Sequence, residues 1–209
     1  MSAAAHQATF DVELPDRPLN RLTTALRAFT VIPAAILLAS LSGGGLFAGS
    51  GNSGLWIAFG GPGLLFVPPL LMLVFREKYP RWWYDFNVEL LRYSARVGAY
   101  AALLTDAYPS TDEQQSVRLE LPEPDAAGLN RWLPLVKWLL ALPHFVALAF
   151  LYLGAVVAIV ASWFAILFTG RYPAALFDYV VGVGRWNVRV VAYAFALVTD
   201  DYPPFRLAA

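Results

Sequence analysis

The sequence WLLALPHFVALAFLYLGAVVAIVASWFAILFTG, from Trp138 to Gly170, contains no charged side chain. A second charge-free stretch runs from Ala28 to Phe75, and all 15 Lys and Arg residues of the chain lie outside these two stretches. About 20 apolar residues are enough for a helix to cross the hydrocarbon core of a bilayer. Charged residues make up 14% of the chain, compared with about 25% in soluble domains. The pattern therefore predicts an integral membrane protein that is mainly α-helical.

The first charge-free stretch is long enough for two crossings. The run from Ser42 to Gly54 is rich in Gly and Ser, which favour a turn and are poor in a helix interior. We therefore expect helices near 22–41 and 55–75, joined as a membrane hairpin over residues 22–75.

The second charge-free stretch allows two interpretations. Residues 132–170 are too many for one crossing and just enough for two short ones. They form either two short crossings with a tight turn near Leu153 and Gly154, or a re-entrant hairpin that returns without crossing. Lys and Arg flank both hairpins and are missing from both tips, and these residues concentrate on the cytoplasmic side of membranes. We expect a multi-pass protein of the plasma membrane with cytoplasmic N- and C-termini.

The two halves of the chain share motifs at nearly constant spacing. Phe75-Arg-Glu-Lys-Tyr-Pro80 corresponds to Phe168-Thr-Gly-Arg-Tyr-Pro173, and Leu104-Thr-Asp-Ala-Tyr-Pro109 corresponds to Val198-Thr-Asp-Asp-Tyr-Pro203. These matches predict two pseudo-repeats, each able to bury a face that the other could not bury alone.

Each pseudo-repeat is predicted to hold a short strand, a transmembrane or re-entrant helical hairpin, and a long amphipathic helix at the membrane interface. The first repeat spans 1–109, with the hairpin 22–75 and the helix 81–104; the second spans 110–209, with a linker and strand 110–127, the hairpin 132–170 and the helix 174–198. Apolar residues alternate in the two strands, at Phe10, Val12 and Leu14 and at Val117, Leu119 and Leu121. Two isolated strands are marginal in water, so we expect them to pair with each other.

Both amphipathic helices carry a narrow polar stripe. Steps of three and four residues place its members on one face, namely Asp85, Glu89, Arg92 and Arg96 in the first helix and Asp178, Gly182, Arg185 and Arg189 in the second. Many Trp, Tyr and Phe residues surround the stripes, which is typical of the membrane interface. The charged members are candidates either for binding anionic lipid headgroups or for ion pairs where the two repeats meet.

Three blocks of the second half point to a known family. Phe168-Thr-Gly-Arg-Tyr-Pro-Ala-Ala-Leu-Phe-Asp-Tyr179, Gly184-Arg-Trp-Asn-Val-Arg-Val-Val-Ala-Tyr193 and Leu197-Val-Thr-Asp-Asp-Tyr-Pro-Pro-Phe205 resemble the prokaryotic membrane domain called domain of unknown function 4389. The resemblance is looser in the first half, where Arg81-Trp-Trp-Tyr-Asp-Phe86 lacks the Gly pair. It implies two tandem copies of the domain, membrane residence and no assigned activity.

Enzymatic chemistry is not expected. A lipase or esterase needs a Gly-x-Ser-x-Gly elbow with a His and an acid, and Gly49-Ser-Gly-Asn-Ser-Gly54 has the wrong spacing. We predict no catalytic residues, no cofactor and no metal site. Asp106, Asp200 and Asp201, beside Thr105 and Thr199, could be read as metal ligands, but Thr-Asp before Tyr-Pro is adequately explained by turn chemistry.

His144 is the one histidine within the charge-free stretches. Ionisable side chains inside a membrane are functional candidates because burying them is costly. His144 is either a site that senses protons or contacts a ligand, or a neutral imidazole that is hydrogen-bonded to a neighbouring helix or lies near the headgroups.

The net charge of zero leaves no basic surface for nucleic acid. We expect a non-enzymatic accessory or scaffold subunit of a membrane complex, or a lipid-interacting protein. Its partners would be the lipid bilayer and either a larger membrane complex or further copies of the chain. The alternative is a small transporter or channel subunit built from two parallel repeats, although few polar residues could line a pore: His144, Thr30, Ser40, Ser42 and Ser162.

Overall fold

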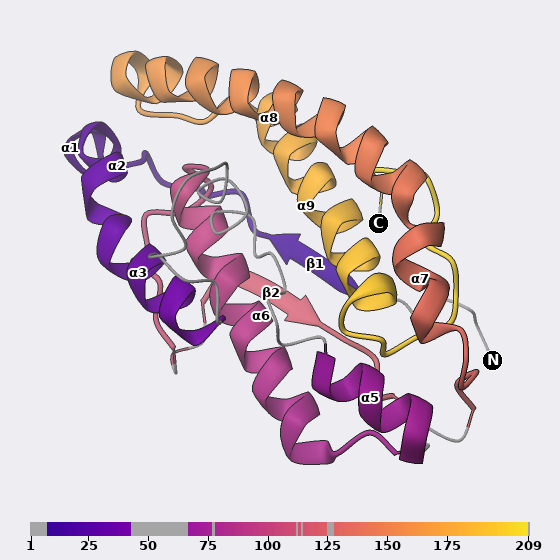
Figure 1. Cartoon of the computed structure of the whole chain (residues 1–209). Coiled ribbons are helices and arrows are strands. Elements are labelled where there is room, and N and C mark those ends of the chain that lie inside the picture. The colour runs from indigo at the N-terminus through magenta and orange to yellow at the C-terminus, as the bar shows by residue number, and fades with distance from the viewer. Residues whose placement is uncertain are drawn as a thin grey trace, which may run out of the picture.

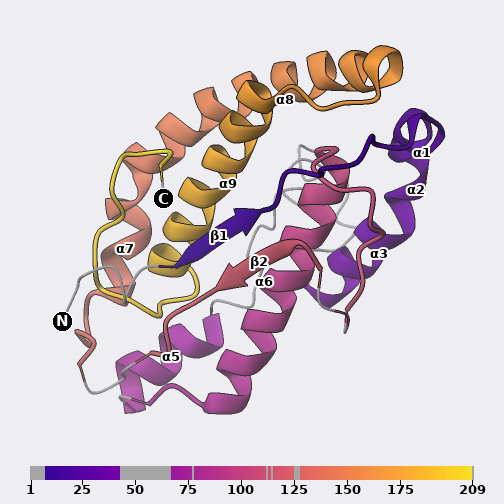
Figure 2. The same ribbon diagram turned by 180° about the vertical axis from the view of Figure 1, so that it is seen from behind.

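Two long helices and a two-stranded ribbon form the centre of the protein. The computed structural model describes residues 8–42, 67–76, 78–111, 113, 115–124 and 128–208. The central helices are α6 (Arg81–Ala101) and α9 (Ala174–Ala194), and the strands are β1 (Thr9–Val12) and β2 (Val117–Glu120). Strand β1 packs on α9, and β2 packs on α6 (Figure 2).

Six further described helices lie outside this centre (Figure 1). They are α1 (Arg21–Ala25), α2 (Arg27–Thr30), α3 (Ile32–Leu41), α5 (Val67–Arg76), α7 (Pro134–Leu140) and α8 (Leu142–Thr169). Helix α3 packs on α6, and α8 packs on α9, while α1 also contacts α8 and α5 contacts α7. The mainly helical fold class predicted from composition is confirmed.

The ribbon joins the two halves of the chain. Strands β1 and β2 run antiparallel, with Phe10 opposite Leu119 and Asp11 opposite Arg118. The buried side chains alternate with exposed ones along both strands, as predicted. Leu14 is the exception, because it lies beyond the end of β1 and is exposed. The predicted pairing of the two strands is confirmed.

Residues 142–169 form one continuous helix, so the predicted turn near Leu153 and Gly154 is wrong. Gly154 lies inside α8, where a Cβ atom would collide with the hydroxyl oxygen of Tyr179 on α9. The glycine therefore allows close helix packing and does not reverse the chain. Helix α8 ends at Gly170, whose φ of +74° is the left-handed conformation that glycine favours at helix ends. Residues 132–170 thus form α7 followed by α8 and no hairpin.

The helix predicted over 22–41 is divided into α1, α2 and α3. Pro33 lies in the first turn of α3, and Pro143 lies in the first turn of α8. Proline has no N–H to donate to the carbonyl four residues earlier, so it is tolerated at a helix start and interrupts a helix interior. Helix α5 covers the end of the predicted helix 55–75. The hairpin tip and the rest of that helix lie outside the described residues.

Helices α6 and α9 begin at the predicted positions and end about one turn earlier than predicted. The reason is a left-handed residue after each helix, Leu103 with φ +65° and Leu197 with φ +57°. Each of these turns is contacted from the other half of the chain. The Tyr172 hydroxyl donates to the carbonyl of Ala102 at 3.5 Å, and the Tyr79 hydroxyl donates to the carbonyl of Ala196 at 3.0 Å.

Candidate functional site

The outer face of α8 is an exposed apolar surface, which we call the α8 stripe. Its members are Val146, Phe150, Leu153, Val157, Val160, Phe164 and Phe168, and each is at least half exposed. Their spacing of three or four residues places them on one side of the helix. The opposite side, which includes His144 and Ser162, is buried against the rest of the protein. Within the described residues, α8 is the one helix long and apolar enough to cross a membrane.

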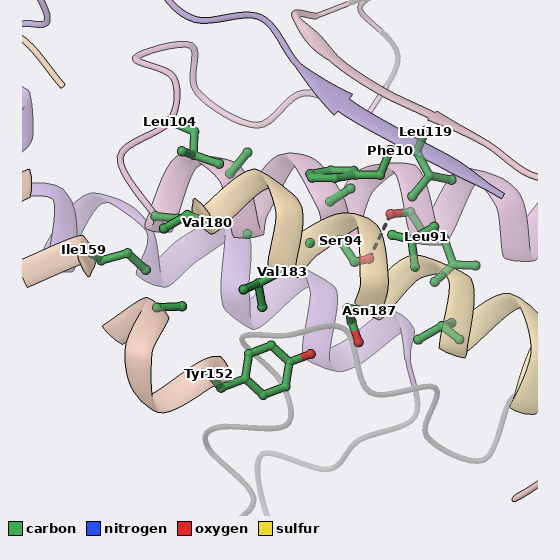
Figure 3. Close-up of a pocket in the computed structure, with 18 residues that line it drawn as sticks. Phe10, Leu91, Ser94, Leu104, Leu119, Tyr152, Ile159, Val180, Val183 and Asn187 are labelled. Carbon is green, nitrogen blue, oxygen red and sulfur yellow. Dashed lines mark hydrogen bonds between the residues drawn. The ribbon is translucent and has the colours of Figure 1, made fainter. Parts of the chain in front are cut away.

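A cavity of about 100 Å³ lies between α6, α8 and α9, beneath the ribbon (Figure 3). Phe10 and Leu119 from the two strands lie on one side of it, and Tyr152 and Asn187 lie on the other. The remaining lining residues are mostly Ala, Val, Leu, Ile and Gly. No local pattern in the sequence predicts this cavity, because its walls come from segments far apart in the chain.

Two buried cations are held by matching ion pairs. A guanidinium nitrogen of Arg27 lies 2.5 Å from Oδ1 of Asp106, and the Arg27 side chain is only 3% exposed. The Nζ atom of Lys137 lies 2.7 Å from Oδ1 of Asp200, and its side chain is fully buried. Each cation also donates to the carbonyl of the threonine that precedes its aspartate.

The second carboxylate oxygen of each aspartate accepts a backbone N–H. The N–H of Asn20 donates to Oδ2 of Asp106 at 2.7 Å, and the N–H of Asn130 donates to Oδ2 of Asp200 at 2.7 Å. The two carboxylates are thus occupied by groups of the chain itself. Among the described residues, no group of three or more His, Asp or Glu side chains could hold a metal ion.

The adjacent threonines have the geometry of the predicted turns. The Oγ1 atom of Thr105 accepts the N–H of Ala107, and the Oγ1 atom of Thr199 accepts the N–H of Asp201. A Ser or Thr oxygen that accepts the N–H two residues later stabilises a tight turn. The structure therefore accounts for both Thr-Asp motifs as turns that end in an ion pair.

Arg92 and Arg185 anchor the ribbon to the two central helices. The Nε atom of Arg92 donates to the carbonyl of Leu119 at 3.1 Å, and that of Arg185 donates to the carbonyl of Phe10 at 3.1 Å. Arg92 also pairs with Glu89 on its own helix, and Arg185 pairs with Asp11 on β1. Each arginine thus contacts a strand from the other half of the chain.

Arg96 and Arg189 hold the segments that follow their own helices. Arg96 donates to the carbonyl of Ser110 at 2.7 Å, and Arg189 donates to the carbonyls of Arg206 and Ala208. Arg189 is only 7% exposed. Its burial, followed by the nearby charges of Arg206 and Arg185, lowers the pKa of its guanidinium.

The two aspartates of the polar stripes are separated from these arginines. Asp85 and Asp178 are both exposed, and neither forms an ion pair within the part of the chain that the structure describes. The structure thus brings the four arginines to backbone carbonyls and leaves the two aspartates on the surface.

His144 is fully buried in the first turn of α8. Its Nδ1 atom accepts the indole N–H of Trp186 at 2.9 Å, which places the proton of the neutral ring on Nε2. The Phe205 ring stacks on the imidazole with the ring centroids 4.0 Å apart. Among the described residues, Nε2 has no hydrogen-bond partner. The hydrogen bond to Trp186 of α9 agrees with the interpretation of His144 as a neutral imidazole bonded to a neighbouring helix.

The hydroxyls considered as pore-lining groups lie in separate places. Ser40 donates to the carbonyl of Leu37, and Ser42 donates to that of Ala39, so both bond within their own helix. Thr30 forms a hydrogen bond with the hydroxyl of Tyr100 at 2.8 Å. Ser162 is buried on the inner side of α8.

Comparison with known proteins finds one similar family. Residues 132–206, which include α7, α8, α9 and Asp200, match the family described as Domain of unknown function (DUF4389). The match covers one copy of the domain, whereas two tandem copies were expected. No curated protein and no solved structure matches the chain. Over residues 132–206 the chain is thus similar to a family to which no activity is assigned.

Proposed function

We propose that the protein is a non-enzymatic, lipid-interacting membrane protein whose α8 stripe contacts the hydrocarbon chains of the bilayer. The observation that carries the proposal is the exposure of the stripe, in which Phe150 is 73% and Phe168 is 78% exposed. Apolar surface in water is unfavourable by about 25 cal/mol for each Å². A lipid bilayer removes this surface from water without a protein partner.

The dimensions of α8 fit this role. Its 28 residues extend about 42 Å at 1.5 Å per residue, more than the hydrocarbon thickness of about 30 Å. Trp132 and Trp138 lie before the helix and are both more than half exposed. Exposed Trp side chains are typical of the boundary between hydrocarbon and headgroups. The proposal keeps the plasma membrane as the location of the protein, and its multi-pass arrangement with cytoplasmic termini rests on the distribution of Lys and Arg along the sequence.

We further propose that the two halves are copies of one unit. Three pairs of contacts support this, since each recurs in both halves: Arg27–Asp106 with Lys137–Asp200, Arg92–Leu119 with Arg185–Phe10, and Tyr172–Ala102 with Tyr79–Ala196. The last two pairs connect one half to the other. In this arrangement the duplicated units form a scaffold that holds apolar helices against lipid.

Alkaline carbonate extraction of membranes from expressing cells tests the proposal. We expect the full-length chain to stay in the membrane pellet. Val157→Lys puts a charge at the centre of the stripe, so a larger share of this variant should be extracted. Ala175→Lys, at an exposed position in the first turn of α9, is the matched control and should behave like the unchanged chain. Complete release of the unchanged chain by carbonate would refute a lipid-embedded α8.

A further inference from the structure

The cavity beneath the ribbon is a candidate binding site. It is about 100 Å³ in volume and is lined mainly by apolar side chains of α6, α8 and α9 (Figure 3). We propose that it takes the end of one hydrocarbon chain of a membrane lipid. The inference rests on the proposed contact between α8 and the bilayer and names the place where a lipid chain is held.

Water is a poor occupant of this cavity. A buried water molecule needs two to four polar partners, whereas an apolar cavity of about 150 Å³ in another protein stays dry and binds benzene. Three lining side chains carry polar groups: Ser94, Tyr152 and Asn187. The Ser94 hydroxyl already donates to the carbonyl of Leu91 at 2.8 Å. The walls beneath the ribbon therefore favour an apolar occupant.

Small residues on α6 keep the cavity open. Ala95, Gly98 and Ala99 of α6 line it, together with Ala102 at the C-cap, and Gly98 and Ala99 lie three and four residues after Ala95 on the same side of the helix. On the α9 side, Gly184 lets the Phe10 ring lie close to the helix, because a Cβ atom would be 2.6 Å from that ring. A close-packed interior would fill such a space with larger side chains.

Helix α8 links the cavity to the lipid-facing surface. Its residues Tyr152, Ala155 and Ile159 line the cavity, while the neighbouring Leu153 and Val160 belong to the exposed α8 stripe. The same two turns of α8 therefore face both the proposed bilayer and the cavity. The volume suits a few methylene groups of a linear chain, because it is smaller than the cavity of about 150 Å³ that holds one benzene molecule in another protein, and it is too small for the four fused rings of a sterol.

Photocrosslinking in lipid vesicles tests the inference. The full-length chain is reconstituted with a phosphatidylcholine that carries a diazirine near the end of one acyl chain, and labelled residues are mapped by mass spectrometry. We expect labels on the α8 stripe and also on residues 94–101 of α6 and 183–191 of α9. Labels on the stripe without labels on α6 and α9 would overturn the inference and leave the proposed function intact. Absence of labels on the stripe would refute both.

A substitution that fills the cavity should exclude the lipid chain from it. Ala95→Phe fills it and is expected to abolish labelling of α6 and α9, while labelling of the stripe persists. Ala161→Phe adds the same ring at an exposed position of α8 and is expected to leave the cavity labels unchanged.

Ile159→Ala enlarges the cavity and is expected to increase the labelling of α6 and α9. Thermal unfolding in detergent shows whether Ala95→Phe folds. If it does not fold, Ile159→Ala still tests the inference. Cavity labels that are the same in Ile159→Ala as in the unchanged chain would overturn the inference.

Discussion

The fully buried amine of Lys137 lies 2.7 Å from Oδ1 of Asp200. It is also 5.1 Å from the centroid of the Tyr193 ring, so a carboxylate and an aromatic face both stabilise its charge. Asp200 is 27% exposed, so the two partners differ in their access to water. Removing one partner should therefore have a different effect from removing the other.

Asp200→Asn is expected to destabilise the fold by about 3 kcal/mol, because it leaves a buried ammonium without its counter-ion. Lys137→Met should cost less, since it removes the buried charge and Asp200 still reaches water. Denaturant unfolding in detergent, followed by tryptophan fluorescence, measures both. The exposed pair Arg118–Glu13 is the control, and Arg118→Met should change stability by about 1 kcal/mol or less. Equal losses for Asp200→Asn and Arg118→Met would contradict the prediction.

Arg27→Lys is expected to lower the unfolding free energy by about 1–2 kcal/mol, although the charge is kept. The guanidinium bonds to the carbonyls of Tyr100 and Thr105 and pairs with Asp106. It also lies 4.0 Å from the centroid of the Tyr100 ring. An ammonium cannot keep the planar stacking together with these contacts. Arg171→Lys, at an exposed position, serves as the control in thermal unfolding. The prediction fails if both variants unfold at the same temperature.

Gly154→Ala should destabilise the protein, even though alanine is the better helix former by about 1 kcal/mol. The added Cβ atom collides with the hydroxyl of Tyr179, which donates to the carbonyl of Leu151 at 3.0 Å. Tyr179→Phe removes the colliding oxygen, so adding it to Gly154→Ala should recover stability. A double-mutant cycle by denaturant unfolding measures the coupling. Purely additive effects would show that the two residues do not meet.

Spin labels on single engineered cysteines should report the two sides of α8. The chain has no cysteine, so each label is unique. Labels at Phe150, Val157 and Phe164 should collide with dissolved oxygen and be protected from a water-soluble nickel complex. If α8 crosses the bilayer, this protection should be greatest at Val157, near the middle of the helix. Power-saturation electron paramagnetic resonance in vesicles measures how often each label collides with oxygen and with the nickel complex. Strong nickel access at all three positions would exclude lipid contact.

The sequence was most informative where one local property decides the structure. The lack of charge between Trp138 and Gly170 predicted an apolar helical segment, which is α8. Alternation around Phe10 and Leu119 predicted two strands and, with the marginal stability of isolated strands, their pairing. The periodicity of the polar stripes likewise predicted α6 and α9, and the Tyr-Pro motifs before them marked where these helices begin.

The sequence was less informative where contacts between distant segments decide the structure. Glycine is common in turns, so the sequence predicts a turn at Gly154, whereas its role in packing depends on Tyr179, which comes from another helix. The pairing of Lys137 with Asp200 joins residues whose separation in the chain follows no local periodicity. The shared motifs of the two halves do point to this kind of pair, because a basic residue and a Thr-Asp motif occur in both halves.

The crossed hydrogen bonds of Tyr79 and Tyr172 also bear on the order of events during synthesis. Tyr79 is made long before its acceptor, the carbonyl of Ala196, and the carbonyl of Ala102 is made before its donor, Tyr172. The turn that ends α6 therefore stays incomplete until most of the chain has left the ribosome. The Tyr79 hydroxyl is a protonated donor at neutral pH, and burial raises its pKa further. We expect the first half of the chain to need protection from association with other molecules until the second half has been synthesised.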